Sequence, residues 1–557
     1  VALSAQPIAY IQDVSGNTVT TSNATIYLSS NGGYGGNRSM AAVNGVADFA
    51  GQGFYLYGAS GWALVYADSP GLGQGVQSIN LAVGAPYRLV TKVASAGAVN
   101  GVAFTTQPQI YVKDRGGNLV TATSVAVTVT SNGSGLGGTQ TVNSASGVAT
   151  FTDLSLTGAL GTYTLTFSSS GVISQQQSIT VAVGAAAKLT LTTSPTGFTN
   201  RTSFAAKPVI AIQDASGNTL TSSTAAVDVS ISSGALTGTT HVTAVNGVAT
   251  FSDLGKYGLV GSKRLTFSSG NLTPATFDFD LTFGAVNKLN LSVASSLSND
   301  TAFATQPVVT IQDQDGNTVT DQNSTVTLTA TGATTVALGG TTSMDAVNGV
   351  ADFTGKGIKL TGTAGSKTLT ASISSPGNFS VPATITLGYG QATKLALTTD
   401  PAGFVNRTAF TTQPVITVQD VSGNTVGNSN ISIDVSIDSG ALTGTTRINA
   451  VNGIATFVGL GKAGTIGDKL LTFSDTAGQL ATATKSFTLT HGAAHHTTLA
   501  VASTLVNNTA FATQPVVTIY DADNNVVTTG SQSTQTVTLS ATGATISGAV
   551  TMDARDG

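Results

Sequence analysis

One short phrase recurs along the chain at nearly constant spacing, and it limits the possible folds more than any other feature. Its landmark is a proline followed six positions later by an aspartate, as in "QPVITVQD", which ends at Asp420. The proline falls at Pro7, Pro108, Pro208, Pro307, Pro414 and Pro515, in steps of 101, 100, 99, 107 and 101 residues. Repeats of this length indicate an array of similar small domains.

Two further landmarks divide the copies from one another. A phrase such as "AVNGVATF" lies between successive prolines, and a joint such as "VGAAAKL", from Val183, ends each copy. We therefore predict six domains, called modules one to six: 1–84, 85–184, 185–284, 285–390, 391–492 and 493–557. By alignment, module one starts at Val1 without its opening strand and module six stops before its second half. We expect the natural protein to extend in both directions.

The residues after each proline alternate between apolar and polar, as in Ile210 and Ile212 or Ile416 and Val418. This period of two is typical of a strand with one buried face, and proline at the first position of a strand loses no ladder hydrogen bond. Roughly seven short strands per module, separated by Gly, Asn and Ser, predict an all-β array of Ig-like Greek-key sandwiches with short linkers. We expect core positions for the phenylalanines before the prolines and in the "VATF" phrases.

The phrases "V-x-V-x-D-x-x-G-N-x-V" and "x-V-N-G-V-A-x-F" resemble the bacterial immunoglobulin-like (Big) repeats of invasin/intimin-type adhesins and other large surface proteins. The resemblance covers nearly the whole chain. It implies the Ig-like fold, but such repeats serve as stalks, adhesive modules and surface-layer or filament subunits alike. The sequence departs from the family in having very little charge and no glutamate.

The composition argues against several classes of partner. Charged residues make up 9% of the 557 residues, the net charge is −4, and cysteine is absent. The chain therefore offers no basic surface for nucleic acid, no disulfide framework and no thiolate metal site. No apolar run reaches the ~18 residues of a membrane helix, so we expect no membrane insertion by this segment.

Calcium is the one cofactor that the sequence suggests, at a single loop. "DQDGN" supplies Asp313, Asp315 and Asn317, whose alternating oxygens could begin a calcium loop. The sister loops, such as "DVSGN" and "DADNN", lack the second carboxylate or the glycine. The alternative is a turn in which the aspartate accepts local backbone N–H groups and the Gly-Asn pair allows a left-handed residue. In "DADNN", Asn524 replaces that glycine.

Aromatic residues are concentrated in module one. Seven of the 12 tyrosines and the only tryptophan lie in the first 90 residues. We predict a contact surface, for a glycan or a neighbouring subunit, formed by Tyr34, Tyr55, Tyr57, Trp62 and Tyr66. We expect "NGGYGGN", which carries Tyr34, to be a loop. Core packing of some of these residues is the alternative.

No module supplies a catalytic set that its sister copies lack, so we expect no enzyme activity. We predict a secreted or cell-surface structural protein that forms an elongated rod or scaffold and associates with neighbouring copies, with a filament, sheath or surface layer as the forms that such assembly could take. The alternative is a cell-surface adhesin in which one or more modules bind glycans or matrix.

Overall fold

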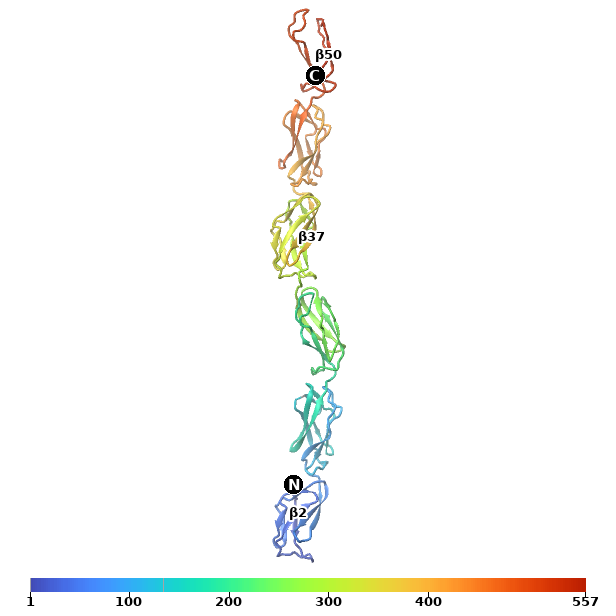
Figure 1. The fold of residues 1–557 in the computed structure, drawn as a ribbon, viewed down its shortest axis with the longest axis vertical. Helices are drawn as coiled ribbons and strands as arrows, with labels where there is room; N and C mark the ends of the chain where they lie inside the picture. Colours follow the sequence, from blue (N-terminus) through green and yellow to red (C-terminus); the bar gives the residue numbers. More distant parts are fainter. Residues whose placement is uncertain (1, 134) are drawn as a thin grey trace. The chain divides into compact units, whose positions relative to one another are not determined.

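The structure, a computed structural model, describes residues 2–133 and 135–557, and Val1, the expected start of module one, lies outside these ranges. It divides into two compact units, residues 1–282 and 283–557. All regular elements of the described residues are β-strands (Figure 1). Within these ranges there is no helix long and apolar enough to cross a membrane.

Module one contains two small pairs of strands and one larger sheet. The pairs are β1 with β5 and β3 with β6, and the four-stranded sheet has the order β4-β2-β7-β8. The strands are β1 (Ile8–Tyr10), β2 (Thr25–Ser30), β3 (Gly33–Gly35), β4 (Ser39–Ala41), β5 (Val46–Asp48), β6 (Tyr55–Tyr57), β7 (Gly61–Asp68) and β8 (Gly75–Leu81).

Module two has a strand, β9, between β17 and β10, whereas the corresponding strands of module one, β8 and β1, belong to separate sheets. Its main sheet has the order β13-β11-β16-β17-β9-β10-β14, and β12 pairs with β15. The strands are β9 (Arg88–Val93), β10 (Gln109–Lys113), β11 (Ala126–Ser131), β12 (Gly135–Gly137), β13 (Thr141–Asn143), β14 (Val148–Thr150), β15 (Ser155–Thr157), β16 (Gly161–Ser169) and β17 (Val172–Val181).

Module three has three sheets, with the orders β18-β20-β24, β23-β21-β26-β27 and β19-β25-β22. Strands that are neighbours in space but not in sequence, such as β21 and β26, give the Greek-key connections. The strands are β18 (Lys188–Thr193), β19 (Thr202–Ser203), β20 (Val209–Gln213), β21 (Ala226–Ile231), β22 (Ala235–Thr237), β23 (His241–Thr243), β24 (Val248–Thr250), β25 (Gly255–Tyr257), β26 (Gly261–Ser268) and β27 (Ala275–Leu281).

Module four, in the second unit, repeats this plan with the sheets β28-β30-β34, β29-β37-β36-β31-β33 and β32-β35. The strands are β28 (Lys288–Ser292), β29 (Ser296–Ser298), β30 (Val308–Gln312), β31 (Thr325–Thr331), β32 (Val336–Gly339), β33 (Ser343–Asp345), β34 (Val350–Asp352), β35 (Lys359–Gly362), β36 (Gly365–Ile373) and β37 (Phe379–Gly388).

Module five has the sheets β38-β39-β43, β42-β40-β45-β46 and β41-β44. Its strands are β38 (Lys394–Thr399), β39 (Val415–Gln419), β40 (Ser432–Ile437), β41 (Ala441–Thr443), β42 (Arg447–Asn449), β43 (Ile454–Thr456), β44 (Gly461–Ala463), β45 (Gly467–Asp475) and β46 (Ala483–Leu489). Module six has two pairs, formed by β47 (His496–Ala500) with β48 (Val516–Tyr520) and β49 (Thr536–Thr538) with β50 (Thr551–Asp553).

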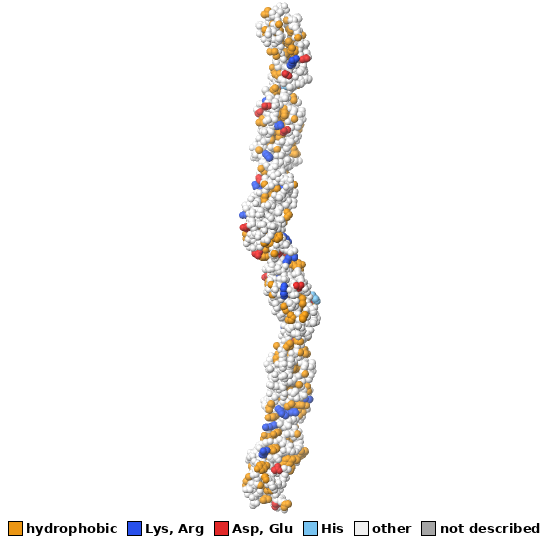
Figure 2. Space-filling model, in the orientation of Figure 1, with side chains coloured by type: hydrophobic (Ala, Val, Ile, Leu, Met, Phe, Trp, Pro, Cys, Tyr) orange, Lys and Arg blue, Asp and Glu red, His pale blue; other side chains and the backbone are white. Residues whose placement is uncertain are grey.

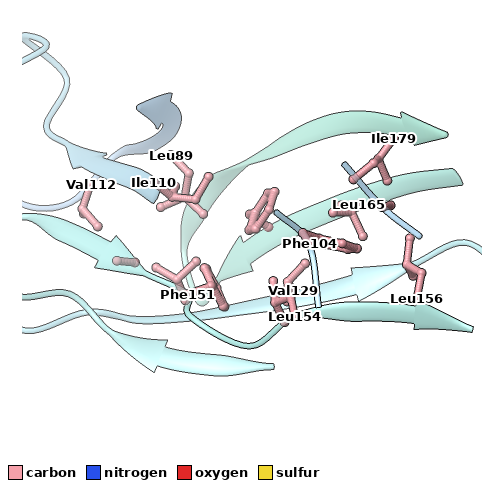
Figure 3. Close-up of a cluster of buried hydrophobic side chains, with 14 of the residues drawn as sticks. Leu89, Phe104, Ile110, Val112, Val129, Phe151, Leu154, Leu156, Leu165 and Ile179 are labelled. Carbon is pink, nitrogen blue, oxygen red and sulfur yellow. The ribbon is translucent and has the colours of Figure 1, made fainter. Parts of the chain in front are cut away.

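The predicted inward residues form the cores. Figure 3 shows part of the core of module two, where Ile110, Val112 and Phe151 gather between the strands. The inward residues of the strand after the proline are fully buried in modules two to five: Ile110, Val112, Ile210, Ile212, Val309, Ile311, Ile416 and Val418. This confirms the alternating pattern and the all-β Ig-like fold.

Two expectations need correction. The estimate of roughly seven strands is too low, because module two alone has the nine strands β9 to β17, two of which form the short pair β12-β15. Phe511 is only partly buried, whereas its counterparts in modules two to five are buried. In module six the described residues form only two strand pairs, so fewer strands surround Phe511 than surround its counterparts.

Candidate functional site at the module joints

The recurring aspartate organises a loop of five residues, Asp214 to Asn218 in module three, that follows the proline-led strand of each module. In module three, Asp214 Oδ1 accepts the backbone N–H of Asn218 at 2.9 Å, and Asn218 Nδ2 donates to both carboxylate oxygens at 3.1 and 2.9 Å. Gly217, with φ of +91°, supplies the left-handed residue. At the equivalent position Asn524 has φ of +63°, which confirms the predicted exchange of glycine for asparagine.

The second oxygen of this carboxylate reaches across the joint to the preceding module. Asp214 Oδ2 accepts a hydrogen bond from Asn100 Nδ2 of module two at 2.8 Å and from the backbone N–H of Gly184 at 3.1 Å. In return, Asn218 Nδ2 donates to the carbonyl oxygen of Gly158 in module two at 2.8 Å. We call this arrangement the joint network, and Asn100 its joint asparagine.

The second unit contains the same joint network twice. Between modules four and five, Asn299 Nδ2 donates to Asp420 Oδ2 at 2.8 Å, and Asn424 Nδ2 donates to the carbonyl of Gly362 at 2.9 Å. Between modules five and six, the corresponding pairs are Asn406 with Asp521 at 2.8 Å and Asn525 with Gly464 at 3.0 Å.

The joint between modules five and six carries an additional ion pair. Arg407 Nε and Nη2 donate to the two oxygens of Asp523, each at 2.7 Å. Hydrogen bonds and charge from Arg407 lower the pKa of Asp523 to about 2, against the opposing effect of burial. A bidentate pair of this kind adds directional specificity to the joint.

The joint carboxylates are buried yet held in the charged form. Asp214, Asp420 and Asp521 are at most 2% exposed. Burial alone would raise the pKa of Asp214, but hydrogen bonds from Asn218, Gly184 and Asn100 outweigh it and lower this pKa to about 2. The same balance lowers the pKa values of Asp420 and Asp521. Every lone pair that would face water therefore faces an N–H donor.

The joint glycines are required by close packing against the joint asparagine. A Cβ on Gly184 would lie 2.7 Å from the carbonyl oxygen of Asn100, and a Cβ on Gly492 would lie 2.7 Å from that of Asn406. These distances are shorter than van der Waals contact. The joint thus has no room for a side chain at this position.

The joint between modules one and two has the same loop and additional cation–π contacts. Asn118 Nδ2 donates to the carbonyl of Gly58 at 2.7 Å, as its counterparts do. Arg115 of the loop also lies over the rings of Tyr55, Tyr57 and Tyr87, with its guanidinium carbon 5.7, 5.9 and 5.6 Å from the ring centroids. Cation–π contacts therefore contribute to this joint.

The structure separates the five aromatic residues of the predicted contact surface. Tyr55 and Tyr57 lie at the first joint with Arg115. Tyr34 lies on the other face of β3-β6, where it packs against the core, with its ring centroid 6.2 Å from that of Phe54. The expected loop around Tyr34 is wrong, because residues 33–35 form the strand β3. The rings of Tyr57 and Tyr55 cover Gly33 and Gly35 and supply the packing that glycine lacks.

Trp62 and Tyr66 lie together on the outer face of β7. Trp62 is 74% exposed and Tyr66 is partly exposed. Tyr66 is paired across the sheet with Ser29 on one side and with Val76, which is 54% exposed, on the other. In module two the corresponding outer residues of β16 are Thr162, Thr164 and Thr166. Figure 2 shows hydrophobic side chains on the surface near the N-terminal end of the chain.

The predicted calcium residues form a hydrogen-bonded turn. Asp313 Oδ1 accepts the backbone N–H groups of Asp315 at 3.0 Å and Asn317 at 2.9 Å, and Oδ2 accepts that of Gly284 at 2.9 Å. Asn317 directs its amide N–H toward the same carboxylate. Ca²⁺ needs oxygen ligands, so residues arranged in this way do not fit the ion. In the described ranges no three acidic or histidine side chains come together as a metal site.

The joint asparagines were missed by reasoning from the sequence, although a signal for them exists. In modules two to six an asparagine precedes, by four residues, the phenylalanine that lies before the recurring proline. These asparagines are Asn100, Asn200, Asn299, Asn406 and Asn507. The strand pattern gives no reason for a fixed asparagine there. Such a recurrence is a sign of a contact made by the side chain.

No family model and no curated protein matches the sequence. Among solved structures, the bacterial integrin-binding protein invasin matches with 14% identity and a TM-score of 0.26 over 72% of this chain and 79% of invasin. An Escherichia coli adhesin matches with 17% identity and a TM-score of 0.26 over 55% of this chain and all of the adhesin.

A surface layer protein, represented by its domains 4–9, matches with 15% identity and a TM-score of 0.19 over 93% of this chain and 82% of that one. Similarity at this level concerns the fold and does not assign a function. The strand orders of the modules are those of Greek-key sandwiches. The chain is an Ig-like β-sandwich repeat protein.

Proposed function

We propose that the chain is an extracellular or cell-surface structural protein whose modules form an elongated, semi-rigid scaffold. The observation that carries this proposal is the joint network, which recurs at three joints with the same atoms in the same roles. A repeated contact between modules, rather than a site within one module, supports a role that depends on how modules are held together.

The hydrogen bonds of the joint network support a stiff connection between neighbouring modules. Bending a joint would pull a buried carboxylate away from its N–H donors, and a hydrogen bond to a charged group contributes ~1.5 to 3 kcal/mol. Because the linkers are only a few residues long, they allow little additional motion between modules. Motion between neighbouring modules should therefore be small unless the network is broken.

The test measures the spread of distances across one joint. Since the chain has no cysteine, Ser174→Cys and Thr276→Cys place spin labels on modules two and three. We expect a narrow distance distribution by double electron–electron resonance, and a broader one after Asn100→Ala. A broad distribution in the parent chain would refute the scaffold proposal.

Assembly of copies into a filament, sheath or surface layer is a finer form of the same proposal. Negative-stain images and sedimentation of the intact chain over a wide concentration range test it. Ordered filaments or sheets would support assembly, whereas a monodisperse monomer at high concentration would limit the function to a single scaffold.

The second candidate is an adhesin, and the outer face of β7 favours it. This face carries Trp62, Leu64 and Tyr66 where module two has threonines, and exposed aromatic rings can stack on sugar rings. Binding to a glycan array should be lost in Trp62→Ala and kept in the matched control Thr162→Ala. If the parent chain binds no glycan, the adhesin candidate fails while the scaffold proposal is untouched.

A further inference from the structure

The residue that follows each joint asparagine differs between modules, although its backbone conformation does not. These residues are Gly101, Asp300 and Arg407, with φ of +75°, +58° and +65°. All three lie in the left-handed region, which Asp300 and Arg407 adopt with a full side chain. Because the backbone conformation is shared, the side chains of Asp300 and Arg407 leave their modules at equivalent places. We call this place the end position.

The third residue of the loop in the next module is directed at the same end of the preceding module. Across the joint between modules two and three, Ser216 Oγ donates to Asn100 Oδ1 at 3.3 Å. Across the joint between modules five and six, Asp523 Oδ2 accepts Nδ2 of Asn406 at 2.8 Å and Nε of Arg407 at 2.7 Å. We call this third residue the loop position.

The end position and the loop position never combine two like charges in these three joints. The combinations are Gly101 with Ser216, Asp300 with Ser422, and Arg407 with Asp523. The acidic end of module four thus meets a neutral loop residue, and the basic end of module five meets an acidic one.

The carboxylate of Asp523 depends on the end position that it meets. Its side chain is only 17% exposed, and besides its contacts with module five's Asn406 and Arg407 it accepts the backbone N–H of Gly464 at 3.2 Å. A carboxylate that has lost most of its water is costly unless a cation lies beside it. Arg407 supplies that cation, whereas an aspartate at the end position would add a second negative charge.

The end of module four carries such an aspartate. Lys359 Nζ and Thr361 Oγ1 of the same module donate to Asp300 Oδ1 at 2.6 and 3.2 Å. These hydrogen bonds lower the pKa of Asp300, and the negative charge of Asp420 in module five opposes them. Asp300 is therefore within electrostatic range of the loop of the next module, where Ser422 adds no charge.

We propose that the end position and the loop position together select which module can follow which. The end of module five, with Arg407, accepts a loop whose third residue is an aspartate, and the end of module four, with Asp300, rejects the same loop by like charge. The partner that each end recognises is thus a loop of this repeat with a defined charge at its third residue. This inference rests on the scaffold proposal, because it concerns the specificity of the same joints.

The test places the acidic loop residue of module six in module five of the full chain. Ser422→Asp puts a carboxylate opposite Asp300, and Ser422→Asn is the matched neutral control. Spin labels at Ser380→Cys and Thr484→Cys, at exposed positions of β37 and β46, report distances across this joint. We expect a narrow distribution in the parent chain and in Ser422→Asn, and a broad one in Ser422→Asp.

Hydrogen exchange gives a second readout that needs no label. The amide of Ala364 in module four donates to Asn424 Oδ1 of module five at 2.6 Å, so its protection reports closure of this joint. In Ser422→Asp this amide should exchange at least about tenfold faster than in Ser422→Asn, because like charges ~4 Å apart near a protein surface repel strongly enough for such a change.

A second substitution tests whether Asp300 is the cause. Asp300→Arg, added to Ser422→Asp, recreates the combination of Arg407 with Asp523 in the joint between modules four and five. The double variant should recover both the narrow distribution and the slow exchange of Ala364.

The proposal is overturned if Ser422→Asp and Ser422→Asn give the same distribution and the same exchange rate. It is also overturned if Asp300→Arg does not rescue Ser422→Asp, because the end position would then not decide the outcome. Failure of the scaffold proposal is distinguishable, since the distribution would already be broad in the parent chain. Such a result would refute both proposals, because a joint that is not held together cannot select its partner.

Discussion

The joint between modules one and two and the joint between modules two and three use the same loop with different partners. In both, the loop asparagine donates to a glycine carbonyl of the preceding module, from Asn118 at 2.7 Å and from Asn218 at 2.8 Å. Asn100 contributes to the second joint, and Arg115 with three tyrosine rings contributes to the first. The contact to the backbone is common to both joints, and the cation–π contacts are particular to the first.

A third copy of the loop, at Asp13, forms the same turn and has no partner from a preceding module among the described residues. Asp13 accepts the N–H groups of Ser15 at 2.9 Å and Asn17 at 3.0 Å, as its counterparts do, but its side chain is exposed. Comparing Asp13 with Asp214 therefore separates the contribution of the turn from that of the joint.

The largest effect is expected from Asp214→Ala. This change removes the acceptor of the buried N–H of Gly184 and one acceptor each of Asn100 and Asn218, and we expect module three to lose about 4 kcal/mol of stability. The matched variant Asp13→Ala should cost module one under about 1 kcal/mol. Hydrogen exchange of β20 and β26 against β2 and β7 measures both. Equal losses of stability in modules one and three would mean that the joint contacts of Asp214 contribute nothing beyond the turn itself.

Asn100→Asp should open the second joint at neutral pH and leave the first unchanged. It places two carboxylates at the position of a 2.8 Å hydrogen bond, with an expected cost of about 3 kcal/mol. Because like charges raise the pKa of one partner, acidification should restore the contact by protonating it. Spin labels across each joint report the change. A distance distribution that stays narrow at pH 7 would contradict the role of Asn100.

Acid should weaken the parent joint only at low pH. The pKa of Asp214 falls from an ordinary value of 3.8 to about 2 in the folded chain. The stabilisation is complete above about pH 5 and is lost as the pH falls through the folded pKa, a total of roughly 2 kcal/mol. Hydrogen exchange of module three along a pH series, corrected for intrinsic rates, measures it. A loss of stability that begins near pH 6 would mean that a group other than Asp214 is being protonated.

Arg115→Gln should loosen the first joint by about 1 kcal/mol, since it removes the cation from three aromatic faces. The change removes the charge, shortens the side chain and leaves Asp114 and Asn118 in place. Label distances across the first joint should broaden slightly, while those across the second joint stay the same. No broadening would show that Asn118 and the linker suffice there.

The smallest effect is expected from calcium. Since Asp313 already accepts N–H donors on both oxygens, adding Ca²⁺ or a chelator should move the melting temperature of the chain by less than about 1 °C. Calorimetry of the parent chain and of Asp315→Asn tests this. A clear upward shift that is lost in Asp315→Asn would support the calcium site.

The sequence predicted the fold well because the fold depends on local patterns. The alternation at Ile210 and Ile212, the proline before β20 and the left-handed Asn524 are all decided by neighbours within a few residues. The joint network depends instead on Asn100 meeting Asp214, which lies 114 positions later in the chain. No strand periodicity indicates such a pair.

The aromatic residues illustrate a second limit. Their concentration in module one is visible in the sequence, but their faces depend on the register of β3 with β6, which pairs Tyr34 with Leu56 and Gly33 with Tyr57. A shift of one residue would exchange the inward and outward rings. For this reason the sequence suggested one surface where the structure has three environments.

Module two carries both halves of the joint chemistry at opposite ends, with Asp114 and Asn118 in one loop and Asn100 with Gly158 at the other. The two ends of such a module therefore differ: one carries the aspartate–asparagine loop, and the other carries the asparagine and the glycine carbonyl that the loop of the next module contacts. A recombination event that duplicates or deletes one whole module would therefore bring an aspartate–asparagine loop against an asparagine and a glycine carbonyl again. The number of copies can change while these shared contacts are kept, whereas the Arg407–Asp523 pair and the Arg115 contacts belong to single joints.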